Sequence, residues 1–239
     1  MKKMKYLLFA FVVFSCERED DFSPSNLSEV FVLSIENNNA LADGVSKIKV
    51  ISEFPSNFNT EDDQKVDFIV FKEENETSSS GIVLKETTNG DKKIAEMLVD
   101  HVTADTIKVQ GTIKINTASI SKEINIIFKK AYPDSINTYS SSLTIKPNSF
   151  DEIEITTELI RKKGMVSLHS IAETIVVDSL GNSRGFFNNY RNVSDNTGEI
   201  KNRFTLGDDS YLGPLKVIST TANGLNLIKK DSIIITSKN

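Results

Sequence analysis

Apolar and polar residues alternate along much of this chain, and the alternation returns in its second half at a nearly constant distance. Alternation with a period of two predicts β-strands that turn one face to a core. Three apolar positions of the first half are matched 105 residues later. The matched positions are Ile48, Val50 and Phe54 in the first half and Ile153, Ile155 and Leu159 in the second. We therefore expect a chain built mainly of β-sheet.

Later in each half the distance between matching residues becomes 108, and we expect it to hold to the end of each half. The matched pairs are Gly90 with Gly198, Asp100 with Asp208, Ile107 with Leu215, Lys108 with Lys216, Val109 with Val217, and Ile126 with Ile234. A repeat of strands and turn residues indicates two tandem units of one architecture. We place these units at residues 28–131 and 132–239, with Tyr132-Pro133-Asp134-Ser135 as the joint.

Each unit is about 100 residues long and carries roughly seven short segments with strand-like alternation. That size and number of strands are typical of an immunoglobulin-like Greek-key β-sandwich. The composition agrees, because Ile, Val and 14 Phe recur along the chain, and the best helical candidate, residues 84–99, is interrupted by a turn signal at 87–91. The single cysteine allows no disulfide within the chain, so apolar packing alone must hold each core.

The first 15 residues have the order of an export signal. Three lysines, Lys2, Lys3 and Lys5, precede the apolar run Tyr6–Phe14. Nine residues of helix extend about 14 Å, whereas the hydrocarbon core of a bilayer is about 30 Å thick. The run is therefore too short to span a membrane, and we interpret residues 1–15 as a signal peptide that is removed. The alternative is an ordinary secretory leader followed by an incidental cysteine.

Residues 13–16, Val-Phe-Ser-Cys, resemble the lipobox of bacterial lipoproteins, in which the cysteine becomes the acylated first residue of the mature chain. The resemblance implies a covalent lipid on Cys16 and attachment to the bacterial outer membrane through that lipid. The acidic run Glu17–Asp21 resembles the surface-export signal of lipoproteins from Bacteroidetes-type bacteria. We therefore expect exposure on the cell surface, with residues 16–27 as a flexible tether. An orientation toward the periplasm stays open.

Residues 39–50 (NALADGVSKIKV) resemble the opening of bacterial Ig-like domains of the invasin/intimin type, in which an Ala-Asp-Gly turn leads into the second strand. The second unit has Pro147-Asn148-Ser149 in place of that turn. Further segments follow the family's order, namely 94–99, 106–109 and 124–128 in the first unit and 175–182, 195–200 and 213–217 in the second. The resemblance implies two tandem Ig-like β-sandwiches, which in this family commonly build a stalk that carries a binding tip.

Charge and motif content exclude several classes of function. Loss of the three leader lysines changes the net charge from −5 to −8, which disfavours nucleic acids and anionic lipid head groups as partners. The two histidines, His101 and His169, are not at metal-ligand spacing, and no nucleophile or phosphate-binding motif is present. The acidic clusters Glu61–Asp63 and Asp208–Asp209 are interpreted as solvated loops, with calcium binding or acid–base chemistry as alternatives. We expect no catalytic residue, no metal and no cofactor.

The expected partner is a protein or a glycan at the cell surface. Recognition would use three loops of the second unit that are rich in Gly, Asn, Asp and Ser. Those loops are residues 181–185, 188–198 and 207–213. Alternatively, the chain is a structural or accessory subunit that docks on an envelope complex, for example one that captures glycans. The aromatic residues Phe186, Phe187 and Tyr190 could stack on a sugar, although packing is the more frequent role of such residues.

Four short sequences of the form Asp-Ser/Thr-aliphatic resemble O-glycosylation sites of Bacteroidetes-type bacteria. The residues that would carry the sugar are Thr106, Ser135, Ser179 and Ser232. Ser135, at the joint between the units, is the favoured site.

Overall fold

The computed structural model describes residues 29, 31–55, 64–72, 77–115, 118–225 and 227–239. The predicted signal peptide, Cys16 and the tether lie outside these residues. The described residues form sixteen β-strands in four four-stranded sheets, which confirms the all-β prediction. No helix in this part of the chain is both long and apolar enough to cross a membrane.

Eight strands come from each half of the described chain, one more than the roughly seven expected, because each half contains one strand of only two residues. Those of the first half are β1 (Val32–Glu36), β2 (Ile48–Pro55), β3 (Lys65–Phe71), β4 (Thr77–Val83), β5 (Lys85–Glu86), β6 (Lys92–Val99), β7 (Thr106–Ile115) and β8 (Ala118–Ile127). Those of the second half are β9 (Ser135–Ser140), β10 (Thr144–Ile145), β11 (Ile153–Ile160), β12 (Glu173–Val177), β13 (Phe186–Asn188), β14 (Glu199–Thr205), β15 (Gly213–Ala222) and β16 (Ile228–Ser237).

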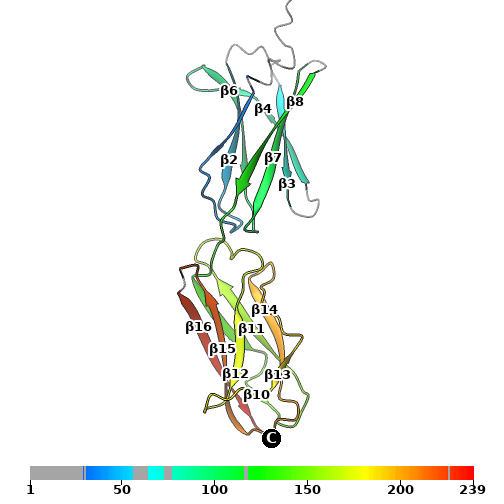
Figure 1. The fold of residues 1–239 in the computed structure, drawn as a ribbon, viewed down its shortest axis with the longest axis vertical. Helices are drawn as coiled ribbons and strands as arrows, with labels where there is room; N and C mark the ends of the chain where they lie inside the picture. The colour runs from blue at the N-terminus through cyan, green and yellow to red at the C-terminus, as the bar shows by residue number, and fades with distance from the viewer. Residues whose placement is uncertain (1–28, 30, 56–63, 73–76, 116–117, 226) are drawn as a thin grey trace, which may run out of the picture.

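The first half forms a sandwich of two sheets, in the orders β1-β2-β6-β5 and β4-β3-β7-β8 (Figure 1). Burial alternates along β2 and β7, so every second side chain points into the core. Ile48, Val50 and Phe54 are all buried, as the alternation predicts, and Phe54 stacks on Phe31 with 5.0 Å between ring centroids. Each such side chain stabilises the fold by about 1.5–3 kcal/mol on leaving water.

The second half repeats this arrangement, with sheets in the orders β13-β14-β11-β9 and β10-β16-β15-β12. Ile153, Ile155 and Leu159 are buried at the positions matched to the first half. The first strand changes sheets along its length, because β9 pairs antiparallel with β11 and β10 then pairs parallel with β16. A parallel bridge between Leu41 and Lys129 is the counterpart in the first sandwich. Both sandwiches therefore have immunoglobulin-like strand orders.

The predicted distance of 108 residues holds up to the last strand of each half and is wrong there by one residue. Ile107 and Leu215 are both buried, as predicted. In the register, however, Ile107 pairs with Ile126, whereas Leu215 pairs with Ile235. Ile235 is buried and its neighbour Ile234 is exposed. The hairpin between β15 and β16 is longer than that between β7 and β8, so the residues of β16 are displaced by one position relative to those of β8. A shift of one residue turns a strand residue to the other face of the sheet.

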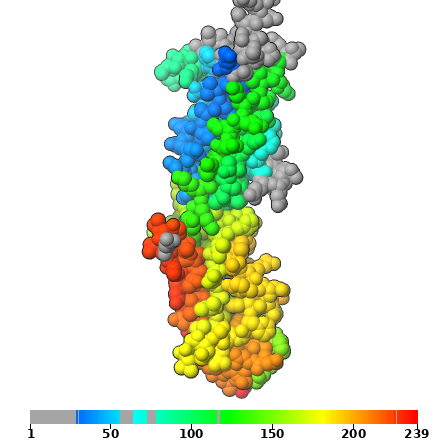
Figure 2. Space-filling model, in the orientation of Figure 1, coloured from blue at the N-terminus to red at the C-terminus, as the bar shows by residue number. Residues whose placement is uncertain are grey.

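The two sandwiches lie end to end and give the molecule an elongated shape (Figures 1 and 2). β1 begins at the outer end of the first sandwich, since Val32 pairs with Glu53, and the chain then runs toward the joint, where Leu41 bridges Lys129. The proposed boundary between residues 131 and 132 lies in the segment that connects β8 to β9.

Candidate functional site

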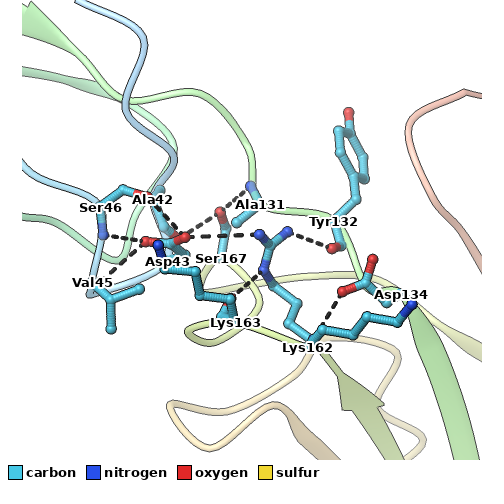
Figure 3. Close-up of polar contacts among 11 residues, drawn as sticks. Ala42, Asp43, Val45, Ser46, Ala131, Tyr132, Asp134, Lys162, Lys163 and Ser167 are labelled. Atoms are coloured by element: carbon cyan, nitrogen blue, oxygen red, sulfur yellow. Dashed lines mark hydrogen bonds and ion pairs between the residues drawn. The ribbon is translucent and has the colours of Figure 1, made fainter. Parts of the chain in front are cut away.

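The joint between the sandwiches is centred on the hydroxyl of Ser167, which comes from the loop between β11 and β12 (Figure 3). This hydroxyl donates a hydrogen bond to the Ala42 carbonyl (2.9 Å) and accepts one from the Ala131 amide (2.7 Å). The Ser167 amide also donates to the Ala131 carbonyl at 3.0 Å. Ala42, Ala131 and Ser167 are fully buried, so each of these polar groups depends on its protein partner.

The Asp43 carboxylate organises the predicted Ala-Asp-Gly turn beside the joint. It accepts hydrogen bonds from the amides of Val45 (3.1 Å) and Ser46 (2.7 Å) and from the Ser46 hydroxyl (3.0 Å). Arg161 of the second sandwich lies 3.7 Å away. Burial raises the pKa of the Asp43 carboxyl, but the hydrogen bonds from Ser46 and Val45 and the charge of Arg161 outweigh burial and hold this pKa below its usual value. The carboxylate therefore stays ionised inside the joint.

Further contacts between the two sandwiches surround Ser167 and Asp43. The amide of Met165 donates to the Asp43 carbonyl at 3.0 Å, and the amide of Leu168 donates to the Val102 carbonyl at 2.8 Å. Gly164 lies so close that a Cβ atom on it would be 2.6 Å from the Asp43 carbonyl oxygen. Arg161 also donates to the Tyr132 carbonyl at 2.8 Å. Contacts from two loops and the connecting segment thus hold one sandwich against the other.

The Pro-Asn-Ser segment of the second sandwich takes the place of the Ala-Asp-Gly turn, as its position in the sequence predicts. Asn148 has a positive φ of 49°, and Gly44 in the first sandwich has a φ of 72°. The Gly44 amide donates a hydrogen bond to the carbonyl of His101, which follows β6. The Asn148 amide donates one to the carbonyl of Asp209, which follows β14, the strand that matches β6. The two turns are therefore equivalent although their sequences differ.

At the far end of the second sandwich, Arg184 joins two of the three loops that we expected to carry recognition, residues 181–185 and 207–213. Its guanidinium donates to the Asp178 carboxylate at 2.9 and 2.8 Å, lies 3.6 Å from Asp209, and is 4.7 Å from the centre of the Tyr211 ring. Burial raises the pKa of the Asp178 carboxyl, but hydrogen bonds, chiefly from Arg184, outweigh burial and keep that pKa well below its usual range. The two loops are clamped together.

The third loop, residues 188–198, is not part of this end. Its segment from Asn192 to Ser194 hydrogen-bonds with Ser170 and Ala172, which belong to the same loop as Ser167. Gly198 lies against the backbone of Leu159 at the joint end of β11. The loop therefore lies toward the joint, so the three candidate recognition loops do not form one continuous surface. A role of these loops in recognition stays a prediction.

The predicted aromatic cluster is divided between the core and the surface. Phe187 points inward and packs against Phe204 and Tyr190, with 5.4 Å between ring centroids in each case. Phe186 points outward and is 47% exposed, beside Gly207 and the 66% exposed Phe150. Phe150 is absent from the sequence-based candidates because nothing in its local pattern distinguishes it from a core residue. We define the distal surface by its exposed apolar side chains, Phe150, Leu180, Phe186 and Leu212.

No protein-family model and no curated protein matches the chain, but solved structures do. The adhesin InvE of Yersinia pseudotuberculosis aligns with 91% of this chain at a TM-score of 0.51 and 15% identity. Invasin, a bacterial integrin-binding protein, aligns with 87% of it at a TM-score of 0.57 and 15% identity. This chain has the fold of tandem invasin-type Ig-like domains. The alignments span 60% of the InvE chain and 39% of the invasin chain.

The histidines of the two Ig-like domains have separate environments. His101, in the first domain, is buried, with its Nε2 atom 3.1 Å from the Asp105 carboxylate and its ring edge-on to Phe128. His169, in the second domain, is exposed and has a positive φ of 59°. Among the described residues, no three His, Cys, Asp or Glu side chains come together as metal ligands.

Of the predicted acidic clusters, Glu61–Asp63 lies outside the described residues, and in the other cluster Asp209 faces Arg184 rather than an open cation site. The four residues proposed for O-glycosylation differ in accessibility. Thr106, Ser135 and Ser179 are exposed, and Ser232 is half-buried on β16. Modification of these residues and lipidation of Cys16 stay predictions.

Proposed function

We propose that this protein is a lipid-anchored, non-enzymatic protein of the bacterial outer membrane that uses its tandem Ig-like domains for adhesion or partner binding at the cell surface. The leader and Cys16 support the anchor. The fold, which InvE and invasin share, supports a role in contact with other surfaces. A fold by itself does not specify a ligand, so the proposal depends on the surfaces that this chain presents.

The distal surface is the observation that carries this proposal. It exposes Leu180 and Leu212, which are 84% and 57% accessible, on the two loops that Arg184 joins, and Phe150, which is 66% accessible, beside Gly207 of the second loop. Exposed apolar side chains on rigid loops can bind without the entropy cost of ordering the loops first. This surface is at the end of the second domain, whereas the chain enters the first domain at its opposite end. An N-terminal lipid would therefore leave the distal surface facing outward.

Protease shaving of intact cells tests the anchor and the orientation together. The full chain is expected in the membrane fraction and accessible to protease, whereas a Cys16→Ala variant is expected to leave the membrane fraction. A membrane-bound chain that is protected from protease would contradict surface exposure. A Cys16→Ala variant that fractionates like the unmodified chain would contradict the lipid anchor.

Adhesion of the same cells to immobilised mucin glycans and matrix proteins tests the distal surface. The double substitution of Phe150→Ser and Phe186→Ser is expected to reduce adhesion at least tenfold. Leu98→Ser, at an exposed position of β6 in the first domain, is the matched control and should leave adhesion unchanged. Equal losses in both variants would contradict a distal binding surface.

A second candidate function is that of an accessory subunit that docks on an envelope complex. An apolar hollow beside the joint favours it. Tyr132 and Pro133 of the connecting segment form one wall of this hollow, and residues of the second domain form the rest.

A further inference from the structure

The hollow has a volume of about 390 Å³ and is bounded by the connecting segment and by the outer face of the sheet that contains β12, β15 and β16. Its volume is near the lower end of the range of about 300–1,000 Å³ that is usual for ligand sites. Its apolar lining is formed by Tyr132, Pro133, Ile171, Ala172, Ala222 and Ile228. Such a hollow has room for one or two large side chains.

Exposed apolar side chains surround the hollow. Ile171 and Ile228 line it and are 53% and 73% exposed. The hairpin that connects β15 to β16 adds the exposed Leu225 and Leu227. This hairpin packs on Tyr132, because a Cβ atom on Gly224 would lie 2.4 Å from the tyrosine ring. A contiguous apolar patch around a hollow is typical of a protein-interaction site.

The rim of the hollow is basic, in contrast to the net charge of −5 for the whole chain. The Lys130 ammonium lies 5.5 Å from the centre of the Tyr132 ring. Lys230 lies opposite Thr220, a residue that lines the hollow. Neither Lys130 nor Lys230 forms an ion pair with another described residue. Glu173 is the one carboxylate in the lining. Because the two lysines outnumber this carboxylate, negative charge on a ligand would complement the rim.

We propose that the hollow is a docking site for a segment of a partner protein that carries a large apolar side chain flanked by carboxylates. The apolar side chain would fill the hollow between Tyr132 and Ile228, as an anchor residue does at the centre of a protein interface. The flanking carboxylates would pair with Lys130 and Lys230 at the rim. This docking proposal rests on the second candidate function and specifies the chemistry of the partner that the accessory subunit would bind. It is independent of the distal surface, which lies at the other end of the second domain.

Fluorescence anisotropy with a labelled peptide, Asp-Glu-Phe-Leu-Glu-Asp, tests the proposal on the full chain in dodecyl maltoside micelles. Saturable binding above that of empty micelles is expected. Two comparison peptides, one with Gly-Gly in place of Phe-Leu and one with Lys and Arg in place of the acids, should bind at least tenfold more weakly. Equal binding of all three peptides, or no binding of the acidic one, would overturn the proposal.

Substitutions locate the binding and separate it from any loss of folding. Ile228→Asp should weaken binding of the acidic peptide at least tenfold, and Leu98→Asp in the first domain should not. The double variant Lys130→Glu and Lys230→Glu should reverse the preference and favour the basic peptide, a gain that an unfolded protein cannot produce. A lipid site would behave differently: decanoate would displace the peptide, and the three peptides would bind equally well. That result would contradict the proposal. If the peptide fails to bind while cells still adhere through the distal surface, the first proposed function stands.

Discussion

The Ser167 hydroxyl of the second Ig-like domain donates a hydrogen bond to the Ala42 carbonyl of the first domain at 2.9 Å, and neither residue is accessible to solvent. The two residues are 125 positions apart in the sequence. A buried hydrogen bond of this kind costs more to break than an exposed one, because the groups that lose their partner find no water. The contact therefore favours one orientation of the two domains.

Ser167→Ala is expected to lower the free energy of unfolding by about 1–3 kcal/mol, because it leaves the Ala42 carbonyl and the Ala131 amide without a partner. Chemical denaturation followed by circular dichroism measures this change. Small-angle X-ray scattering should show a wider range of interdomain angles in the variant. Ser179→Ala, at an exposed position, is the control and should change the free energy by less than about 0.5 kcal/mol. Equal changes in the two variants would contradict the role of Ser167.

Gly164→Ala is expected to destabilise the protein through two effects at the joint. Gly164 has a φ of 70°, which costs a residue with a side chain about 1–3 kcal/mol. In addition, the new Cβ atom would lie 2.6 Å from the Asp43 carbonyl oxygen. Gly181→Ala isolates the first effect, since Gly181 has a φ of 84° and open space around it. The melting temperature should fall further for Gly164→Ala, and an equal fall would show that the contact with Asp43 is unimportant.

Ile235→Ala and Ile234→Ala test the register of β16. Ile235 faces the core opposite Leu215, so its truncation should cost about 2–5 kcal/mol of unfolding free energy. Ile234 is 53% exposed, and its truncation should cost less than about 0.5 kcal/mol. Urea denaturation of both variants measures the difference. The opposite order would restore the sequence-based match of Ile126 with Ile234.

Asp178→Asn is expected to reduce the dependence of stability on pH in acid. The pKa of Asp178 in the folded protein lies well below the value of 3.8 for a free carboxyl. The unfolded chain therefore binds a proton first as the pH falls, and stability that is present above about pH 4 is lost below it. Urea midpoints between pH 6 and pH 2 should fall less steeply in the variant. Asp151→Asn, an exposed carboxylate near the same end, should keep the slope of the unmodified protein.

Local patterns in the sequence predicted the strands and most of the internal repeat. The parity of Ile48, Val50 and Phe54 specified which side chains are buried, because successive side chains of a strand point to opposite faces. The match of Gly90 with Gly198 was also correct, and both residues have a positive φ, of 68° and 86°. The error at Ile234 arose because the lengths of the two hairpins differ, and a constant repeat distance cannot represent that difference.

The sequence by itself determined the all-β fold, the two repeated units and the turn at Asp43, because alternation and turn chemistry act over a few neighbouring residues. Only the tertiary structure decided which loops come together. It joined residues 181–185 to residues 207–213 through Arg184, and it turned residues 188–198 back toward the joint. It also decided that Phe150 is exposed and that Ser167 is buried against Ala42. These outcomes depend on contacts between residues far apart in the chain, which no local pattern encodes.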